Sequence, residues 1–332
     1  MSSLYFTEQK PAHRGFTLIE LLVVIVIIGI LASLIFVGAG AARNAARRGI
    51  IKNEISQVSM ALTSYQQKYG EYPPDFSDYQ AVLRHVRKRW PNFDWQRSYP
   101  DELQRFQGFC DMIATQTAGI DPDIMPYQFE LATDSHGDAK SLGSHIGALA
   151  FWLGGIPDTN GMLNGFSADV TNPLGVTLAG SNWSRNNITQ WDKDSQFMEL
   201  TLKSNCFIVD GVPAIVANGY PIAYFKPNAA GKYIQRDGEV FCIHLDFSKS
   251  EWEYLGVAVP YAKKGAADPA DAVWHNPKTY QLIHPGLDGI FGVGHSAIRV
   301  IDPANDMKTG CELADNDNQA NFGGNTIESA GN

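Results

Sequence analysis

Residues 21–42 form a run of 22 residues without a charged side chain, rich in Leu, Ile and Val. At about 1.5 Å per residue, a helix of this length is about 33 Å long, enough to cross the hydrocarbon core of a bilayer. A cleavable secretory signal has a shorter apolar region and small residues at the cleavage site that follows it. The run therefore predicts a membrane-spanning helix close to the N-terminus.

A carboxylate stands directly before this run, at Glu20. Ionisable side chains at membrane depth are costly, and those that persist there usually have a partner and a function. A plain signal anchor has no use for such a residue. Glu20 therefore indicates a specialised segment.

The residues around Glu20 read RGFTLIELLVVIVIIGILA. This segment resembles the prepilin peptidase site of type IV pilins and of the pseudopilins of type II secretion systems. The resemblance implies cleavage after Gly15, N-methylation of Phe16 as the new N-terminus, and an assembly role for Glu20 at mature position 5. Gly29 at mature position 14 also matches, whereas Val37 stands at position 22, where the family commonly has proline.

The chemistry of these residues suits the implied role. Gly15 has no side chain that would block a protease approaching the backbone. After cleavage, the Phe16 amine and the Glu20 carboxylate are opposite charges in an apolar environment, and pairing between neighbouring subunits would offset the cost of burying either. The implied partners are a prepilin peptidase, other pilin-like subunits in a homo- or hetero-filament, and an inner-membrane assembly platform.

The charges that flank the apolar run disagree with the topology that the resemblance implies. Lys10 and Arg14 precede the run, and four basic residues follow it: Arg43, Arg47, Arg48 and Lys52. Counted alone, they place the C-terminal part in the cytoplasm. The motif is the more specific signal, and it implies a single-pass protein of the inner (cytoplasmic) membrane with a periplasmic or extracellular C-terminal domain.

The helix is expected to continue beyond the apolar run. Apolar residues recur there at spacings of 4-3-4-3-4, which places them on one stripe of an amphipathic helix: Ile51, Ile55, Val58, Leu62, Tyr65 and Tyr69. Gly70 suits a C-cap, and the prolines at 73 and 74 forbid continuation. A helix about 80 Å long is thus predicted over 16–69, with its second half packed on a globular domain.

Further helices are predicted over 77–90, 101–117 and 141–153, followed by loop over 155–195. Alternating, β-branched and aromatic segments then predict strands over 197–202, 222–226, 240–245, 252–259 and 280–284. The expected fold class is α+β, a long helix packed on a mainly antiparallel sheet. The expected segments are a leader (1–15), a transmembrane and assembly helix (16–42), its amphipathic continuation (43–70), a helical and loop insertion (71–195) and a β-rich pilin-like domain (196–332).

Two Asp- and Asn-rich segments near the C-terminus are candidates for a calcium site, GLDGIFG at 286–292 and DNDNQANF at 315–322. Calcium takes six to eight oxygen ligands, which turns rich in Gly and Asp can supply. The pair resembles the C-terminal calcium loop of the major type II secretion pseudopilins, which implies Asp288, Asp315 and Asp317 as ligands. Asp and Asn also populate ordinary turns, because they bond their own backbone. Calcium binding and plain turns therefore both stay open.

The four cysteines leave two alternatives open. Cys110, Cys206, Cys242 and Cys311 form no CxxC pair, so they give a zinc site little support. An even number in an exported domain allows two disulfides. Buried free thiols are the other interpretation.

Composition and motifs argue against two functional classes. The net charge is −9, and because the phosphate backbone attracts basic surfaces, no nucleic-acid binding is expected. The eight histidines are scattered, and no HExxH, GxSxG or P-loop occurs. We therefore expect no enzymatic activity and no catalytic residues.

Three functions remain open. The first is a pilin-like structural subunit, most specifically of a type II secretion pseudopilus, which the YGEYPPD and GLDG segments favour by their resemblance to pseudopilins. The second is a surface type IV pilin for adhesion, motility or DNA uptake. The third, of another class, is a membrane-anchored exported enzyme or binding protein with a prepilin-type leader, whose signature would be a catalytic cluster within 77–195.

Overall fold

The computed structural model describes most of the chain. The described residues are 16–93, 102–117, 130–133, 139–142, 145–158, 160–179, 182–201, 204–209, 212–234, 243–245, 256–292, 298–302, 307–309 and 318–322. The chain divides into two compact units, an N-terminal unit of residues 1–46 and a C-terminal unit of residues 47–332. Helix α1 (Leu18–Tyr69) begins in the first unit and ends in the second.

Helix α1 confirms the long helix predicted over 16–69 and begins two residues later. It extends over 52 residues without interruption. It ends at Tyr69, because Gly70 has a φ of 77°, a left-handed conformation that glycine adopts at little cost. The N–H of Gly70 still bonds the carbonyl of Gln66 at 2.7 Å, so the predicted C-cap residue closes the last turn.

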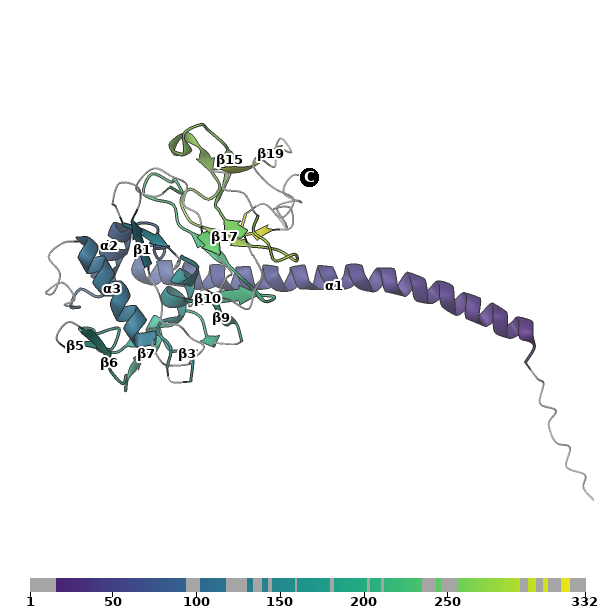
Figure 1. Cartoon of the computed structure of the whole chain (residues 1–332), viewed down its shortest axis with the longest axis horizontal. Helices are drawn as coiled ribbons and strands as arrows, with labels where there is room; N and C mark the ends of the chain where they lie inside the picture. Colours follow the sequence, from purple (N-terminus) through teal and green to yellow (C-terminus); the bar gives the residue numbers. More distant parts are fainter. Residues whose placement is uncertain are drawn as a thin grey trace, which may run out of the picture. The chain divides into compact units, whose positions relative to one another are not determined.

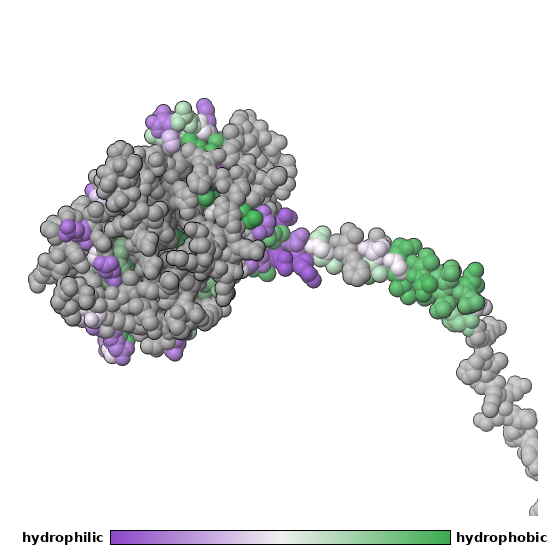
Figure 2. All heavy atoms as spheres, in the orientation of Figure 1, coloured by the Kyte–Doolittle hydropathy of each residue, from purple (hydrophilic) through white to green (hydrophobic). Residues whose placement is uncertain are grey.

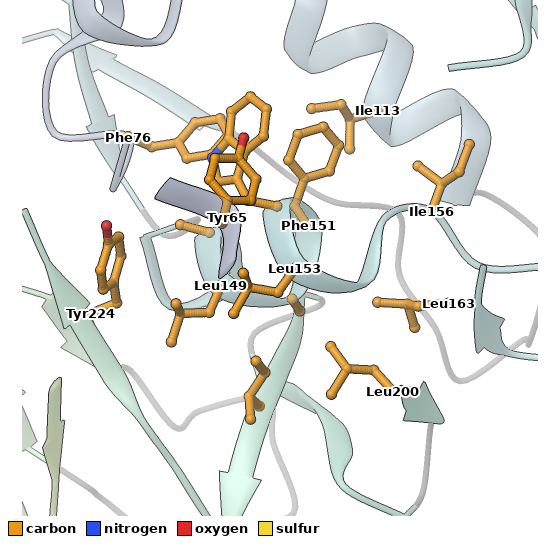
Figure 3. Packing of buried hydrophobic residues seen from close by; sticks show 14 of the residues in the cluster. Tyr65, Phe76, Ile113, Leu149, Phe151, Leu153, Ile156, Leu163, Leu200 and Tyr224 are labelled. Atoms are coloured by element: carbon orange, nitrogen blue, oxygen red, sulfur yellow. The ribbon is translucent and has the colours of Figure 1, made fainter. Parts of the chain in front are cut away.

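Within the C-terminal unit, one face of α1 lies in the hydrophobic core. The residues of the predicted stripe are at most 6% exposed up to Tyr65: Ile51, Ile55, Val58, Leu62 and Tyr65. Tyr69 is partly buried against the same cluster. Burying a large aliphatic side chain contributes about 1.5–3 kcal/mol. Figure 3 shows Tyr65, Phe76 and Phe151 within this cluster, which attaches α1 to the rest of the C-terminal unit.

Two further helices confirm the prediction for the next segment. α2 (Tyr79–Arg89) begins where the carboxylate of Asp78 accepts the N–H of Gln80 at 2.9 Å, which satisfies one of the free donors of the first turn. α3 (Glu102–Thr117) is the helix predicted over 101–117. Both helices bury apolar residues in the core: Val82, Leu83 and Val86 from α2, and Phe109, Met112 and Ile113 from α3.

The helix predicted over 141–153 is wrong in its first part. Strand β2 (Ala139–Leu142) occupies those residues and pairs with β1 (Glu130–Thr133). The chain then forms a 3-10 turn, η1 (His145–Gly147), and a π-helical turn, η2 (Ala150–Gly154). Every residue of η2 is buried, so the segment is enclosed by protein and has no need of the single apolar face on which the prediction rested.

The segment 155–195, predicted as loop, contains short paired strands. β3 pairs with β8, β4 with β7, and β5 with β6. Their bounds are Met162–Leu163 (β3), Phe166–Ser167 (β4), Val176–Ala179 (β5), Asn182–Arg185 (β6), Trp191–Asp192 (β7) and Leu200–Thr201 (β8), with the 3-10 turn η3 at Lys193–Ser195. Strands of two residues are too short for alternation to reveal. β8 is also what remains of the strand predicted over 197–202.

The rest of the C-terminal unit consists of small, mainly antiparallel sheets, which confirms the α+β class. The strand orders are β11-β10-β9, β12-β17-β20, β13-β14 and β16-β15-β18-β19. The bounds are Cys206–Val209 (β9), Val212–Ala217 (β10), Tyr220–Pro221 (β11), Ala223–Phe225 (β12), Ile243–Leu245 (β13), Gly256–Ala258 (β14), Tyr261–Lys264 (β15), Pro269–Asp271 (the 3-10 turn η4), Val273–Trp274 (β16), Gln281–His284 (β17), Arg299–Asp302 (β18), Met307–Thr309 (β19) and Gln319–Ala320 (β20). Figure 1 shows α2 and α3 in one part of this unit, away from β15 and β19.

Several of these strands were predicted. β12 and β17 confirm the strands expected over 222–226 and 280–284. β13 and β14 lie within the ranges 240–245 and 252–259, parts of which fall outside the described residues. A second hydrophobic cluster joins this region, with Phe225, Tyr233, Tyr261, Trp274 and Phe291 as its large members.

Two of the four cysteines lie in the described residues. Cys110 on α3 and Cys206 on β9 are buried free thiols. Burial raises the pKa of both thiols, so they stay protonated and unreactive. Cys242 and Cys311 lie outside the described residues.

Candidate functional site

The implied cleavage position lies at the boundary of the described chain. Gly15 falls outside the described residues, and Phe16 is the first residue within them. Phe16 is 75% exposed and precedes the first turn of α1. The residue that the resemblance assigns as the mature N-terminus is therefore open to solvent at the start of the helix.

Glu20 takes part in a reciprocal cap at the start of α1. Its carboxylate Oε2 accepts hydrogen bonds from the backbone N–H of Thr17 at 2.9 Å and from the Thr17 hydroxyl at 2.8 Å. The backbone N–H of Glu20 donates in turn to the Thr17 hydroxyl oxygen at 3.3 Å. This is a capping box, in which N-cap and N3 side chains satisfy each other's free N–H groups. The carboxylate also lies at the positive end of the helix dipole.

Glu20 was predicted as a functional residue, whereas the capping role of Thr17 was not predicted. The spacing Thr-x-x-Glu before an apolar run is itself a sequence signal for a helix N-terminus, and it would have placed the start of α1 at Leu18. The capping box holds the Glu20 carboxylate at the first turn of the helix. It therefore positions that group next to Thr17, the residue that follows Phe16.

The first turns of α1 present apolar side chains to solvent. Within the N-terminal unit the exposed large residues are Leu18, Ile19, Leu21, Leu22, Val23, Val24, Ile25, Val26, Ile27, Ile28, Ile30, Leu31 and Ile35. Figure 2 shows this apolar surface as a continuous hydrophobic stretch of the helix. An exposed patch of this kind marks a contact with another protein or with lipid. Within the run 21–42, the side chains at 34 and 36–38 lie outside the described part.

No helix in the described part of the chain is both long enough and apolar enough to cross a membrane.

A buried hydrogen-bond chain holds the other end of α1. The hydroxyl of Tyr65 lies 2.5 Å from Nε2 of His85 on α2, and Nη1 of Arg89 donates to the Tyr65 oxygen at 3.0 Å. Nδ1 of His85 lies 2.8 Å from Oε1 of Glu71. Because a carboxylate only accepts, Nδ1 carries the proton, and Nε2 then accepts the Tyr65 O–H. With a neutral imidazole, the Tyr65 hydroxyl, His85 Nδ1 and Arg89 Nη1 each have an acceptor in this hydrogen-bond chain.

The surroundings of these hydrogen bonds keep the His85 imidazole neutral. The hydrogen bond from His85 holds the pKa of Glu71 down at about 2. Burial lowers the pKa of His85 itself, which favours the neutral ring. Arg89 completes the cluster, because its guanidinium lies 4.4–5.6 Å from five aromatic ring centroids: Tyr65, Tyr69, Trp90, Trp152 and Phe166. The end of α1 is thus fixed to α2 and η2.

The structure brings the two predicted C-terminal segments together. β17 pairs with β20, so that His284 faces Gln319 and Ile283 faces Ala320. The turn 286–292 follows β17 directly, and Asn318 reaches it by donating from Nδ2 to the carbonyl of Phe291 at 3.1 Å. The sequence could name the two segments as candidates, but only this long-range pairing places them side by side.

The predicted calcium ligands are only in part described. Asp288 is exposed, and its Oδ1 accepts the N–H of Ile290 at 2.9 Å in an ordinary Asx turn. Asp315 and Asp317 lie outside the described residues. Within the described ranges no group of three or more His, Cys, Asp or Glu side chains could hold a metal ion. Calcium binding through these three residues stays a prediction.

His284 next to this turn is a structural residue. Its Nε2 donates to the carbonyl of Ala217 at 2.8 Å, and its Nδ1 accepts the N–H of Gly286 at 3.0 Å. Burial lowers its pKa to about 4, so the ring is neutral. His295, on the other side of the turn in the sequence, lies outside the described residues.

A polar cleft lies among the described residues of the insertion. Its volume is about 320 Å³, and Ser167, Asp169, Asn172, Asn186 and Gln190 line it. Asp169 and Asn172 bond their own loop, Asp169 to Thr171 and Asn172 to Val176. The described lining residues contain no histidine or cysteine, and they form no nucleophile–base pair.

Known proteins are similar to this chain in the N-terminal segment that contains Phe16, Thr17 and Glu20. Residues 10–36 match the family described as "Prokaryotic N-terminal methylation motif". The chain is 36% identical over 75 residues to the type II secretion system core protein G of Klebsiella michiganensis, covering 23% of this chain and 53% of that relative. It is 28% identical over 138 residues to the core protein G of Pseudomonas aeruginosa, covering 41% of this chain and 87% of that relative. No solved structure is significantly similar.

These findings show that the chain carries the prokaryotic N-terminal methylation motif that pilin-like proteins share. More specifically, it is a distant homologue of the type II secretion system core protein G, the major pseudopilin. The chain spans about half the length of the first of these relatives, and more than half of this chain lies outside the match to the second.

Proposed function

We propose that this chain is a structural subunit that a prepilin peptidase cleaves between Gly15 and Phe16 and that then assembles through its N-terminal helix into a pseudopilus of a type II secretion system. The role is structural and not catalytic. The partners are the peptidase, other pilin-like subunits and an inner-membrane assembly platform. Phe16 is the N-methylated mature N-terminus.

The observation that carries this proposal is the placement of Glu20. Its carboxylate stands at the first turn of α1, capped by Thr17, immediately before a helix surface of exposed apolar side chains. In the single chain the neutral donors of Thr17 satisfy this carboxylate. In a filament the charged Phe16 amine of a neighbouring subunit would be a stronger partner, because charge-assisted hydrogen bonds are roughly twice as strong as neutral ones.

The same residues support a location in the inner membrane. The match to residues 10–36 includes the last six residues of the leader, the cleavage position and most of the apolar run. We place 16–42 in the membrane as a single pass, with the C-terminal unit on the periplasmic or extracellular side. The apolar surface of α1 then faces lipid in the free subunit and neighbouring helices in the filament.

A secretion pseudopilus is favoured over a surface pilus by the names of the relatives, both of which are type II secretion system core proteins. The segment 71–195 follows the long helix directly. Because α2, α3 and η2 from this segment bury the end of α1, the insertion is part of the folded subunit and travels with it into the filament.

Substitution of Glu20 tests the assembly role. Glu20→Ala should leave cleavage after Gly15 intact, since the peptidase acts on the other side of Phe16, and should strongly reduce incorporation into filaments recovered from cells. Glu54→Ala is the matched control, because it removes a glutamate from the same helix beyond the apolar run. Normal filaments from the Glu20 variant would overturn the proposed role of this carboxylate.

A further inference from the structure

The polar cleft of the insertion lies where two antiparallel arms of the chain separate. The arms pair at one end through β4 and β7 and at the other end through β5 and β6. Between these two pairings, residues 168–175 of the first arm lie opposite residues 186–190 of the second, so that eight residues face five. The longer arm cannot stay paired over its whole length, and the cleft of about 320 Å³ lies between the arms.

Backbone hydrogen bonds close the cleft at both ends. The N–H of Ala168 donates to the carbonyl of Gln190 at 3.0 Å, and the N–H of Asn186 donates to the carbonyl of Gly175 at 2.8 Å. All four residues line the cleft. Its walls are therefore fixed before a ligand arrives, and binding does not have to order them.

Side chains hold the longer arm in its bulged conformation. Asn172 donates from Nδ2 to the carbonyl of Val176 at 2.8 Å, and its Oδ1 accepts the N–H of Val176 at 3.1 Å. Oδ1 of Asp169 accepts the hydroxyl of Thr171 at 2.7 Å and the N–H of Thr171 at 2.9 Å. These bonds, the hydroxyl first, lower the pKa of the Asp169 carboxyl, so it is ionised at neutral pH. The first wall thus presents an exposed carboxylate in a fixed position.

The second wall presents side chains that can both donate and accept. Asn187, Thr189 and Gln190 line the cleft and are exposed, so a ligand can reach them. A side-chain amide offers two N–H donors and a carbonyl acceptor, and a hydroxyl offers one donor and two lone pairs. Donors on this wall therefore face the carboxylate acceptor on the other.

The composition of the lining selects the class of ligand. The described lining residues include no Lys, Arg or His, so an anionic ligand would meet only the negative charge of Asp169. They include no aromatic ring on which a nucleobase could stack, and Ala168 and Ile188 are their main apolar members. A neutral molecule with many hydroxyl groups, in contrast, finds hydrogen-bond partners on both walls. The volume is at the lower end of the range of about 300–1,000 Å³ that is typical of ligand sites.

We infer that this cleft binds a neutral saccharide, with Asp169 on one wall and Asn187 and Gln190 on the other bonding its hydroxyl groups. A carboxylate accepts from two adjacent hydroxyls, and an amide donates to one hydroxyl while it accepts from the next. The inference goes beyond the structural role proposed above, because it gives the insertion a recognition function of its own.

Saturation-transfer NMR on the full chain tests this inference. The protein is kept in lauryldimethylamine oxide, a detergent whose headgroup contains no sugar. The probes are N,N′-diacetylchitobiose and cellobiose, each at millimolar concentration. Saturation should pass from the protein to the ring protons of at least one of them. Transfer to diacetylchitobiose alone would support a glycan that carries N-acetyl groups, and transfer to both would support a site that reads hydroxyls only. Transfer to neither would overturn the inference.

Variants of the two walls locate the binding. Gln190→Ala should raise the dissociation constant about tenfold, the value of one hydrogen bond, and should leave the melting temperature unchanged because the side chain is exposed. Ala168→Trp should abolish binding, since its ring would fill the cleft. The control is Gln67→Ala, which removes an exposed amide from α1, outside the cleft. Equal affinity in the wild type, Gln190→Ala and Ala168→Trp would place the saccharide elsewhere and contradict the inference.

Discussion

The hydroxyl of Tyr65 lies 2.5 Å from Nε2 of His85, deep in the C-terminal unit. Tyr65 belongs to the last turns of α1, and His85 belongs to α2. The contact therefore joins the long N-terminal helix to the segment that follows it. Arg89 and Glu71 extend it into a chain of donors and acceptors with one defined direction.

Removal of the Tyr65 hydroxyl should destabilise the C-terminal unit. Tyr65→Phe keeps the packed ring but takes the acceptor from Arg89 and the donor from His85, which costs about 1–3 kcal/mol when such groups are buried. Tyr69→Phe is the matched control, because its ring lies in the same aromatic cluster and is only partly buried. Urea unfolding measures both, and equal midpoints for the two variants would contradict this account.

Stability should fall as the pH drops from about 6.5 to about 4. Burial lowers the pKa of His284 to about 4, and it lowers the pKa of His85 in the same direction. Between pH 6.5 and pH 4 the unfolded chain binds protons that the folded chain does not. The stabilising contribution of the two neutral histidines is therefore complete above about pH 6.5 and is lost as the pH falls toward about 4. His284 alone accounts for about 3 kcal/mol of this change.

Unfolding free energy against pH measures this loss. His284→Gln keeps an amide donor for the carbonyl of Ala217 but cannot titrate, so its stability should fall less steeply across the window. Below about pH 4.5 the free energy of unfolding of the wild-type protein should fall further. Glu71 has a folded-state pKa of about 2, and its stabilising contribution is lost as the pH falls toward that value. A wild-type stability that stays flat between pH 6.5 and 4 would refute the assignment of neutral buried imidazoles.

A side chain at position 289 should disturb the C-terminal turn. Gly289 has a φ of 78°, and a Cβ there would lie 2.4 Å from Cε1 of the Tyr220 ring. Gly289→Ala should therefore cost about 1 kcal/mol for the backbone and a further 1–3 kcal/mol for the overlap. Gly219→Ala is the control, since φ is 89° there but a Cβ would meet nothing within 4 Å. Equal losses for the two would show that the ring contact does not matter.

Local patterns predicted the helical part of the chain. The 4-3-4-3-4 spacing placed Ile51 to Tyr69 on one face, and Gly70 marked the end of the long helix, because these signals act within a few residues. The turn Asn218-Gly219 between β10 and β11 was also readable, since both residues have positive φ and this dipeptide favours such hairpins. That signal was missed.

The C-terminal site could be predicted only in part. The pairing of β17 with β20 joins residues about 36 positions apart, and no local pattern encodes it. Arg299 gave no sequence signal, because a single arginine is usually exposed, and its burial follows from sheet packing around Gly292. The two-residue strands between 155 and 195 are likewise fixed by their partners and not by their own composition.

The central claim is that this chain is a processed pilin-like subunit. Intact mass and N-terminal sequencing of the protein extracted from membranes of cells that contain the prepilin peptidase test it most directly. The account predicts a chain that begins at N-methylated Phe16. A chain that retains residues 1–15 in the presence of active peptidase would contradict it and leave α1 as a plain membrane anchor.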